Sequence, residues 1–69
     1  MTPAIDADRR RMAAYLDEHG ATHGFPLRDA LAWSLGQFWD AVCVAGSGWF
    51  TVTTYGWDLT ARGREEGLA

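Results

Sequence analysis

The chain has 69 residues, of which 48% are hydrophobic, and it carries six Arg, nine acidic residues and a formal charge of −3. This length predicts one domain over residues 1–69, and so apolar a composition excludes a disordered tail. Cys43 is the one cysteine, so an internal disulfide is excluded, and no apolar run predicts a signal peptide or a membrane span. We therefore expect a soluble, cytoplasmic protein.

The first helix is expected to start at Pro3, behind Thr2 as N-cap, and to end at Gly20, which can adopt the left-handed conformation. Charged residues along it, including the run Arg9-Arg10-Arg11, are expected on the solvated side. There the nearby carboxylates can pair with them. The run is therefore interpreted as an exposed helical face more readily than as a phosphate contact.

A second, short helix is expected from Leu27 to about Ala32, because Pro26 can occupy its first turn, and residues 21–25 are interpreted as a loop. Ser34 followed three residues later by Gln37 is a capping box, in which each side chain satisfies an N–H of a new helix. The sequence therefore predicts a third helix that starts directly after Ser34.

The third helix is expected to run from Leu35 to Gly46. Spacings of three, four and three residues predict one buried stripe, formed by Leu35, Phe38, Val42 and Ala45. The outer face then consists of Gln37, Asp40, Cys43 and Val44, with Trp39 at its border.

A β-hairpin is expected next, with strands over residues 49–53 and 57–59, because both segments are rich in aromatic and β-branched residues. Phe50 and Val52 share one face, as do Trp57 and Leu59, so both rows are expected to lie over the helices. Thr60 can cap a last short helix.

Three motifs carry a resemblance to a known family. They are Leu31-Ala32-Trp33-Ser34, Gly48-Trp49-Phe50, and the segment from Trp57 to Arg64 that contains Leu-Thr-x-x-Gly-Arg. In order and spacing they resemble winged helix-turn-helix regulators of the multiple-antibiotic-resistance repressor type. The resemblance covers roughly residues 27 to 64. It implies an α+β fold with three helices, a two-stranded wing and a short C-terminal helix, and a third helix that enters the DNA major groove.

One position departs from the family pattern. Ala32 stands where the family usually has glycine in the turn. If that backbone is left-handed, alanine costs on the order of 1–2 kcal/mol.

Two functions remain open, and the primary one is that of a small transcription-regulator-like domain that binds double-stranded DNA. Gln37 is the one good base-edge donor on the third helix, and Arg28 is placed at the start of the second helix, where phosphates commonly bind. The candidate DNA-binding residues are Arg28, Gln37, Thr53, Thr54, Arg62 and Arg64. The acidic balance and Asp40 oppose this function.

The second function is binding of another protein, including a second copy as a homodimer. Four large aromatic residues, Trp33, Trp39, Trp49 and Tyr55, exceed what so small a fold is expected to bury, and exposed aromatics form binding hot spots. The candidate contacts are Trp39, Asp40, Cys43, Val44 and Tyr55.

Catalysis has little support in the sequence. His19 and His23 are four residues apart, but Gly20 ends the helix between them, so they are not expected to form a metal-binding pair. Cys43 has no base near it in the sequence, and no phosphate-binding glycine loop is present. We therefore expect no enzyme activity, no cofactor, no metal and no small-molecule substrate.

Overall fold

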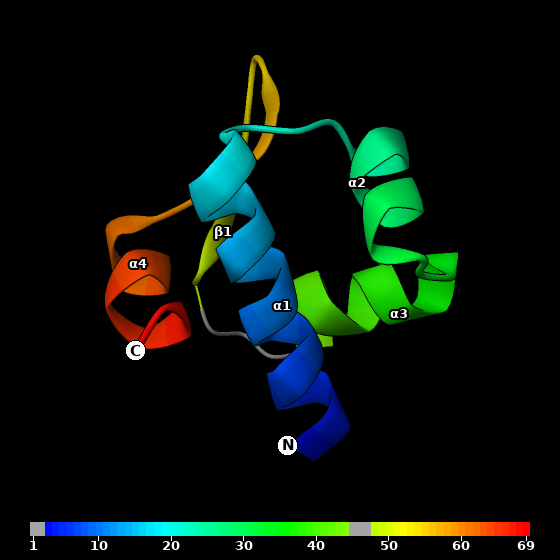
Figure 1. Cartoon of the computed structure of the whole chain (residues 1–69), viewed down its shortest axis with the longest axis horizontal. Coiled ribbons are helices and arrows are strands. Elements are labelled where there is room, and N and C mark those ends of the chain that lie inside the picture. The colour runs from blue at the N-terminus through cyan, green and yellow to red at the C-terminus, as the bar shows by residue number, and fades with distance from the viewer. Residues whose placement is uncertain (1–2, 45–47) are drawn as a thin grey trace.

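Three helices precede a two-stranded antiparallel hairpin and a final helix, which is the α+β winged helix-turn-helix layout expected from the sequence (Figure 1). The computed structural model describes residues 3–44 and 48–69, and the side chains of residues 6–42 and 48–69. The elements are α1 (Pro3–His19), α2 (Gly24–Leu31), α3 (Leu35–Trp39), η1 (Asp40–Val44), β1 (Phe50–Thr53), β2 (Gly56–Leu59) and α4 (Ala61–Gly67).

The predicted helix ends are confirmed where a local side-chain or backbone pattern defines them. Gly20 has φ +80° directly after α1. The Ser34 hydroxyl accepts a hydrogen bond from the Gln37 N–H, and the Gln37 amide oxygen accepts one from the Ser34 N–H, so the capping box at α3 is complete. At α4 the Thr60 hydroxyl accepts from the Gly63 N–H. These bonds satisfy N–H groups that a helix leaves without a partner at its start.

The turn between α2 and α3 contains a left-handed residue that is not glycine. Ala32 has φ 56° and ψ 40°, and its N–H donates to the Asp29 carbonyl while the Trp33 N–H donates to the Arg28 carbonyl. This pair of bonds closes a Schellman-type helix end, in which glycine is the usual left-handed residue. Alanine therefore holds a strained backbone here.

One expected helix boundary is wrong, and two others, Thr2 as N-cap of the first helix and Gly46 as the end of the third, lie outside the described residues. Helix α2 begins at Gly24, so Pro26 lies within its first turn and Phe25 belongs to the helix instead of a loop. After Trp39 the helix continues as one π-helical turn, η1, which widens the spacing of the residues that share a face.

The buried stripe of the third helix also differs from the expectation. Phe38 and Ala41 are buried, whereas Leu35 is 54% exposed and Val42 is partly buried. Ala45 lies outside the described residues. Leu35 is exposed because it stands in the first turn of α3, where the chain emerges from the α2–α3 turn.

The hairpin is tied to the helices at one end of the sheet. Thr22, in the loop after α1, exchanges two backbone hydrogen bonds with Trp57 of β2, and a Cβ on Gly56 would overlap the Thr22 backbone. Phe50 packs against the core as expected, but Val52 is 65% exposed. The expectation for Val52 is wrong because Val52 lies on the outer strand β1, whereas Trp57, opposite it on β2, packs against the core.

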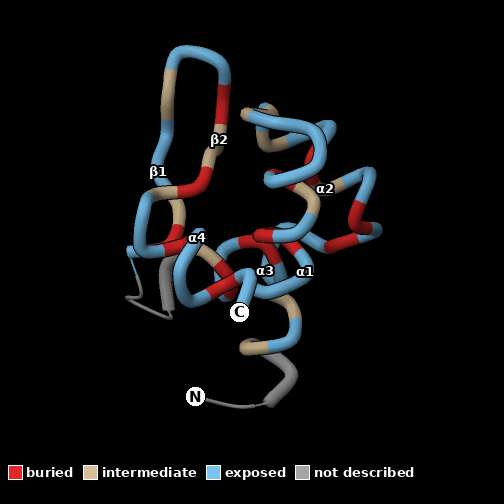
Figure 2. Tube along the Cα trace, turned by 60° about the vertical axis from the view of Figure 1, so that its left-hand side comes forward, coloured by how far each residue is buried: buried red, intermediate tan, exposed pale blue. Residues whose placement is uncertain are grey.

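The core lies where α1 meets α2, α3 and the base of the hairpin (Figure 2). Helix α1 places Met12, Ala13 and Leu16 there, all nearly inaccessible to solvent. The other buried members are Leu27, Leu31, Trp33, Phe38, Ala41 and Leu59. No helix within the described ranges has the length and apolar character needed to cross a membrane.

Helix α4 packs closely on the segment that leads into the wing. The Trp49 carbonyl accepts from the Thr60 N–H, and a Cβ on Gly63 would overlap that same carbonyl and lie 2.9 Å from Leu59 Cδ2. A Cβ on Gly67 would lie 3.0 Å from the Trp49 ring. The glycine of the Leu-Thr-x-x-Gly-Arg segment is therefore required by the close approach of two backbones.

Arg9 does not lie on the solvated side of α1, so that part of the expectation is wrong. Its side chain is 4% exposed, and its guanidinium carbon lies 4.2 Å from the centroid of the Trp49 ring. The same guanidinium pairs with Asp6 at 3.2 Å. Burial of an arginine stem against a tryptophan face, with a carboxylate at its head, accounts for this position.

Candidate functional site

The outward side of α3 and η1 has no basic residue, which is the feature that matters most for DNA binding. Gln37, Trp39 and Asp40 are exposed there, together with Leu35. A helix that inserts into the major groove meets phosphates on both sides, so a cation is expected at its ends or on its flanks. This surface instead presents apolar groups and one carboxylate.

Gln37 and Thr53 have hydrogen bonds within the fold. The amide oxygen of Gln37 is used by the capping box, so only its NH₂ group remains to donate to a base. The Thr53 hydroxyl donates to the Gly56 carbonyl and accepts from the Tyr55 N–H, so it stabilises the turn of the hairpin. Thr54, next to it, is exposed at the tip.

Arg28 is not at the start of α2, as the sequence suggested, but in its last turn. The helix begins three residues earlier than expected, so its positive N-terminal end lies away from this side chain. The guanidinium carbon of Arg28 lies 5.0 Å from the centroid of the Phe25 ring, and its Nε is buried without a hydrogen-bond partner among the described residues.

The arginines of α4 form ion pairs inside the domain. Arg62 pairs with Glu66 one turn later, and Arg64 reaches Asp17 of α1 at 3.1 Å. Figure 1 shows α4 on one side of α1 and α2 on the other. Arg62 and Arg64 therefore do not form a continuous basic strip with Arg28.

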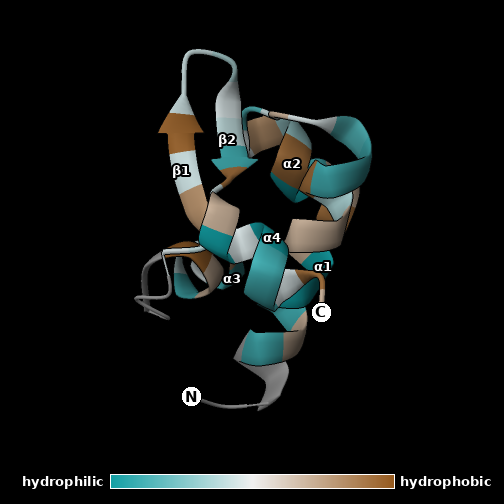
Figure 3. Cartoon of the chain, turned by 90° about the vertical axis from the view of Figure 1, so that its left-hand side faces the viewer, coloured by the Kyte–Doolittle hydropathy of each residue, from teal (hydrophilic) through white to brown (hydrophobic). Residues whose placement is uncertain are grey.

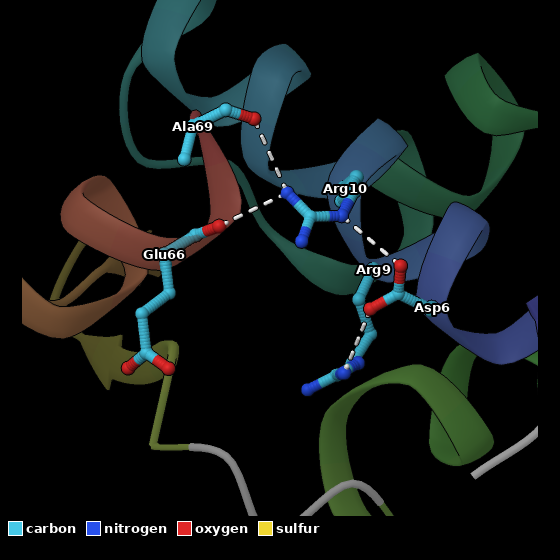
Figure 4. A network of polar contacts seen from close by, with 5 residues as sticks. All are labelled: Asp6, Arg9, Arg10, Glu66 and Ala69. Carbon is cyan, nitrogen blue, oxygen red and sulfur yellow. Dashed lines mark hydrogen bonds and ion pairs between the residues drawn. The ribbon is translucent and has the colours of Figure 1, made fainter.

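Arg10 joins α1 to the end of α4 (Figure 4). Its guanidinium binds the Asp6 carboxylate at 3.0 Å and donates to the carbonyl oxygens of Glu66 and Ala69. The hydrogen bond from Arg10, with the charges of Arg10 and Arg9, lowers the pKa of Asp6 below its ordinary value of 3.8. These two arginines thus have structural partners, whereas Arg11 is exposed.

An apolar hollow of about 200 Å³ lies between α2, α3 and β2. Phe38 is at its base, and its ring makes edge-on contacts with Trp39 at 5.5 Å and Trp57 at 5.4 Å between centroids. Gly24 also borders it, and the other lining side chains are Phe25, Arg28 and Leu35. We call this feature the aromatic hollow.

The rim of the aromatic hollow is unusually exposed for apolar residues. Phe25 is 76% exposed, and Trp39 is 47% exposed. Arg28 is the one charged residue among the residues that line it. The hollow therefore combines large uncovered aromatic surfaces with a single cation.

Phe25 and Leu35 were not among the site residues expected from the sequence. A signal for Phe25 was present: Leu27 and Leu31 are four residues apart and mark the buried side of α2, and Phe25 falls on the opposite side. The misplaced start of α2 concealed that signal. Leu35 had no such signal, because its spacing from Phe38 suits a buried position equally well.

The remaining candidate contacts are spread over the surface. Tyr55, at the tip of the hairpin, is 76% exposed. Trp33 and Trp49 are buried, so of the four surplus aromatics only Trp39 and Tyr55 are exposed. The side chains of Cys43 and Val44 lie outside the described residues.

The two histidines are not brought into a common site. His19 ends α1 and its ring stacks on Tyr15 at 4.2 Å between centroids. Within residues 3–44 and 48–69, no three His, Cys, Asp or Glu side chains gather where they could hold a metal ion.

Comparison with protein-family models, curated proteins and solved structures gives no match to this chain.

Proposed function

We propose that this winged-helix domain binds a protein partner through the aromatic hollow. The observation that carries the proposal is the hollow itself, where exposed Phe25, Leu35 and Trp39 surround a base formed by Phe38. Contiguous exposed apolar surface on a small soluble domain marks an interaction site, and tryptophan is the residue most enriched in binding hot spots.

The size of the hollow favours a side chain of a protein over a small molecule. Its volume of about 200 Å³ is below the range of about 300–1,000 Å³ that is typical of small-molecule pockets. One or two apolar side chains from a partner segment would fill it. The partner is therefore a protein segment with an aromatic or aliphatic anchor.

The charge of the hollow indicates the second property of the partner. Arg28 is the one cation in an apolar lining, and the residue as a whole is half-buried. A carboxylate next to the anchor would form a charge-assisted hydrogen bond with this guanidinium. We therefore expect an acidic residue within a few positions of the anchor.

DNA binding is the alternative, and its support is the winged helix-turn-helix layout alone. The uncharged α3 surface and the internal ion pairs of Arg10, Arg62 and Arg64 weaken it, because phosphate would have to compete with carboxylates already in place. The family resemblance, a regulatory role, a homodimer and a cytoplasmic location likewise remain predictions from the sequence.

The test is selection of a random-peptide display library on the full chain. Enriched peptides are expected to share an aromatic or aliphatic residue close to Asp or Glu. Trp39→Ala should weaken binding of a selected peptide by roughly 2 kcal/mol, and Arg28→Ala should abolish the preference for the acidic residue. Arg64→Ala, which breaks an ion pair on α4, serves as the control and should leave binding unchanged.

A mixed-sequence DNA duplex provides the opposing measurement. In about 0.15 M salt we expect no binding tighter than the non-specific range of about 10⁻⁴–10⁻⁶ M. Tighter binding would contradict the proposal if Arg28→Ala also reduced the number of counterions released on binding, as measured by the salt dependence, by about one. That result would support DNA as the partner.

A further inference from the structure

Strand β1 has an outer edge with which no described residue pairs. Strand β2 is hydrogen-bonded to β1 on one side and to Thr22 on the other, so the order across the sheet is Thr22, β2, β1. Figure 3 shows β1 as the outermost strand, with its far side facing away from α2.

The register shows which backbone groups point to that edge. Trp57 directs its N–H and C=O to Thr22, away from β1. Val52 is the residue opposite Trp57, and in an antiparallel pair two opposite residues turn their backbone groups either both inward or both outward. The N–H and C=O of Val52 therefore point to the free edge, as do those of Phe50 two residues earlier.

Strand β1 lacks the devices that usually protect an edge, apart from being short. Its sequence, Phe-Thr-Val-Thr, contains no charge and no proline, and three of its four residues are β-branched. Edge strands of soluble proteins commonly carry lysine, proline or a bulge because unpaired backbone groups otherwise recruit another strand.

We propose that two copies of this chain associate weakly by antiparallel pairing of β1 with β1 about a two-fold axis. Thr51 would face the second copy's Thr51, and Phe50 would face the second copy's Val52. Phe50 and Val52 exchange both backbone bonds with their opposite residues, which gives four hydrogen bonds. This association involves a different surface from the aromatic hollow and does not depend on the proposed function.

The side chains of the strand complement one another in this register. Val52 is 65% exposed, and the pairing places the second copy's Phe50 beside it on the same side of the sheet. Opposed aromatic and β-branched residues stabilise antiparallel pairs, as do opposed threonines. The pairing would therefore cover the exposed side chain of Val52.

The charge distribution permits two acidic chains to meet at this edge. The nearest carboxylate on the sheet is that of Asp58, opposite Thr51 on β2. In the paired sheet the two Asp58 residues are separated by three strand spacings, about 14 Å, which exceeds the Debye length of about 8 Å at physiological salt. The strand contributes no charge of its own.

The experiment is sedimentation equilibrium of the full chain between about 10 μM and about 1 mM in about 0.15 M salt. We expect a reversible monomer–dimer equilibrium with no larger species, because a two-fold pair leaves no further β1 edge. Val52→Pro removes one outward N–H from each copy without removing a hairpin bond, so it should weaken the dimer about 30-fold. Thr54→Pro is the control. Thr54 is the first central residue of the turn, where proline is favoured, so this variant should not change the dimer affinity.

A cross-linking experiment tests the register and does not require proline to be tolerated. In a Cys43→Ser background, Thr51→Cys should form a disulfide-linked dimer readily, because opposed residues of a non-hydrogen-bonded pair have Cα atoms about 4.5 Å apart. Thr54→Cys should not, since its copies lie about 20 Å apart in this register. Val52→Lys provides a second disrupting variant. A monomer at about 1 mM, a dimer unaffected by both Val52 variants, or equal cross-linking of the two cysteine variants would overturn the proposal.

Discussion

Trp49 and Trp39 lie on opposite sides of α1 and differ in how far their side chains are exposed to solvent. On the α4 side, Trp49 is 4% exposed: the Arg9 guanidinium covers one face, and Gly67 allows the helix to approach its ring. On the α2–α3 side, Trp39 is 47% exposed at the rim of the aromatic hollow. A chain of this size can therefore bury a tryptophan almost completely. The exposure of Trp39 is a property of the aromatic hollow and does not follow from a lack of core volume.

The comparison separates residues that stabilise the fold from residues available for binding. Trp49→Ala should lower the free energy of unfolding by about 3–5 kcal/mol, because a fully buried large aromatic leaves a cavity. Trp39→Ala should lower it by roughly 1 kcal/mol, since about half of its side chain is already solvated. Urea denaturation of both variants checks this, and equal losses would mean that Trp39 is a core residue.

The close backbone approach on the α4 side can be tested in the same way. Gly63→Ala should cost about 3 kcal/mol or more, because the new Cβ overlaps the Trp49 carbonyl and neither backbone can move without breaking the bond to Thr60. Gly36→Ala is the matched control on the α3 side. Its Cβ would have only an ordinary contact at 3.9 Å, and alanine is the better helix former, so stability should stay the same or rise. An unchanged free energy of unfolding for Gly63→Ala would contradict the packing described for α4.

The strained turn on the α2–α3 side predicts a gain of stability. Ala32→Gly removes the strain of a left-handed alanine, which is about 1–2 kcal/mol. Glycine also raises the entropy of the unfolded chain, which costs about 0.4–1 kcal/mol. The free energy of unfolding should therefore rise by roughly 0.5–1 kcal/mol. Ala32 is exposed, so no packing is lost. A lower melting temperature for this variant would show that the turn is not left-handed.

The smallest expected effect concerns acid stability on the α4 side. The pKa of Asp6 is lowered in the folded protein, so its ionised form stabilises the fold above the unfolded-state pKa, and this contribution is lost as the pH falls through the folded pKa. Asp6→Asn should therefore be less stable than wild type near neutral pH and lose less stability on acidification below about pH 4. Parallel pH profiles for the two proteins would contradict this.

Local sequence patterns predicted the elements of the fold and most of their ends. Ser34 with Gln37, and Thr60 with the helix that follows, form caps from residues within one turn of each other, so no tertiary information was needed. The order of three helices, hairpin and final helix followed from these ends and from the strand composition.

The candidate site was less predictable because it depends on contacts between distant segments. The burial of Arg9 requires Trp49, forty residues later in the chain, to lie over it. The predicted position of Arg28 is wrong because α2 begins at Gly24, two residues before Pro26. Trp39 was identified as an exposed contact, but its neighbours Phe25 and Leu35 became visible only when α2 and α3 were placed together.

Mapping of a selected peptide on the isotope-labelled chain tests the proposed binding surface most directly. Amide chemical shifts should change for the residues that line the aromatic hollow and should stay constant along α4; the lining residues are Gly24, Phe25, Arg28, Leu35, Phe38, Trp39 and Trp57. A mixed DNA duplex at about 0.15 M salt should leave the same amides unshifted at concentrations below its non-specific affinity of about 10⁻⁴–10⁻⁶ M. Peptide shifts confined to α4 or the hairpin tip, or duplex shifts concentrated on α3 and the wing, would contradict a protein-binding role for the hollow.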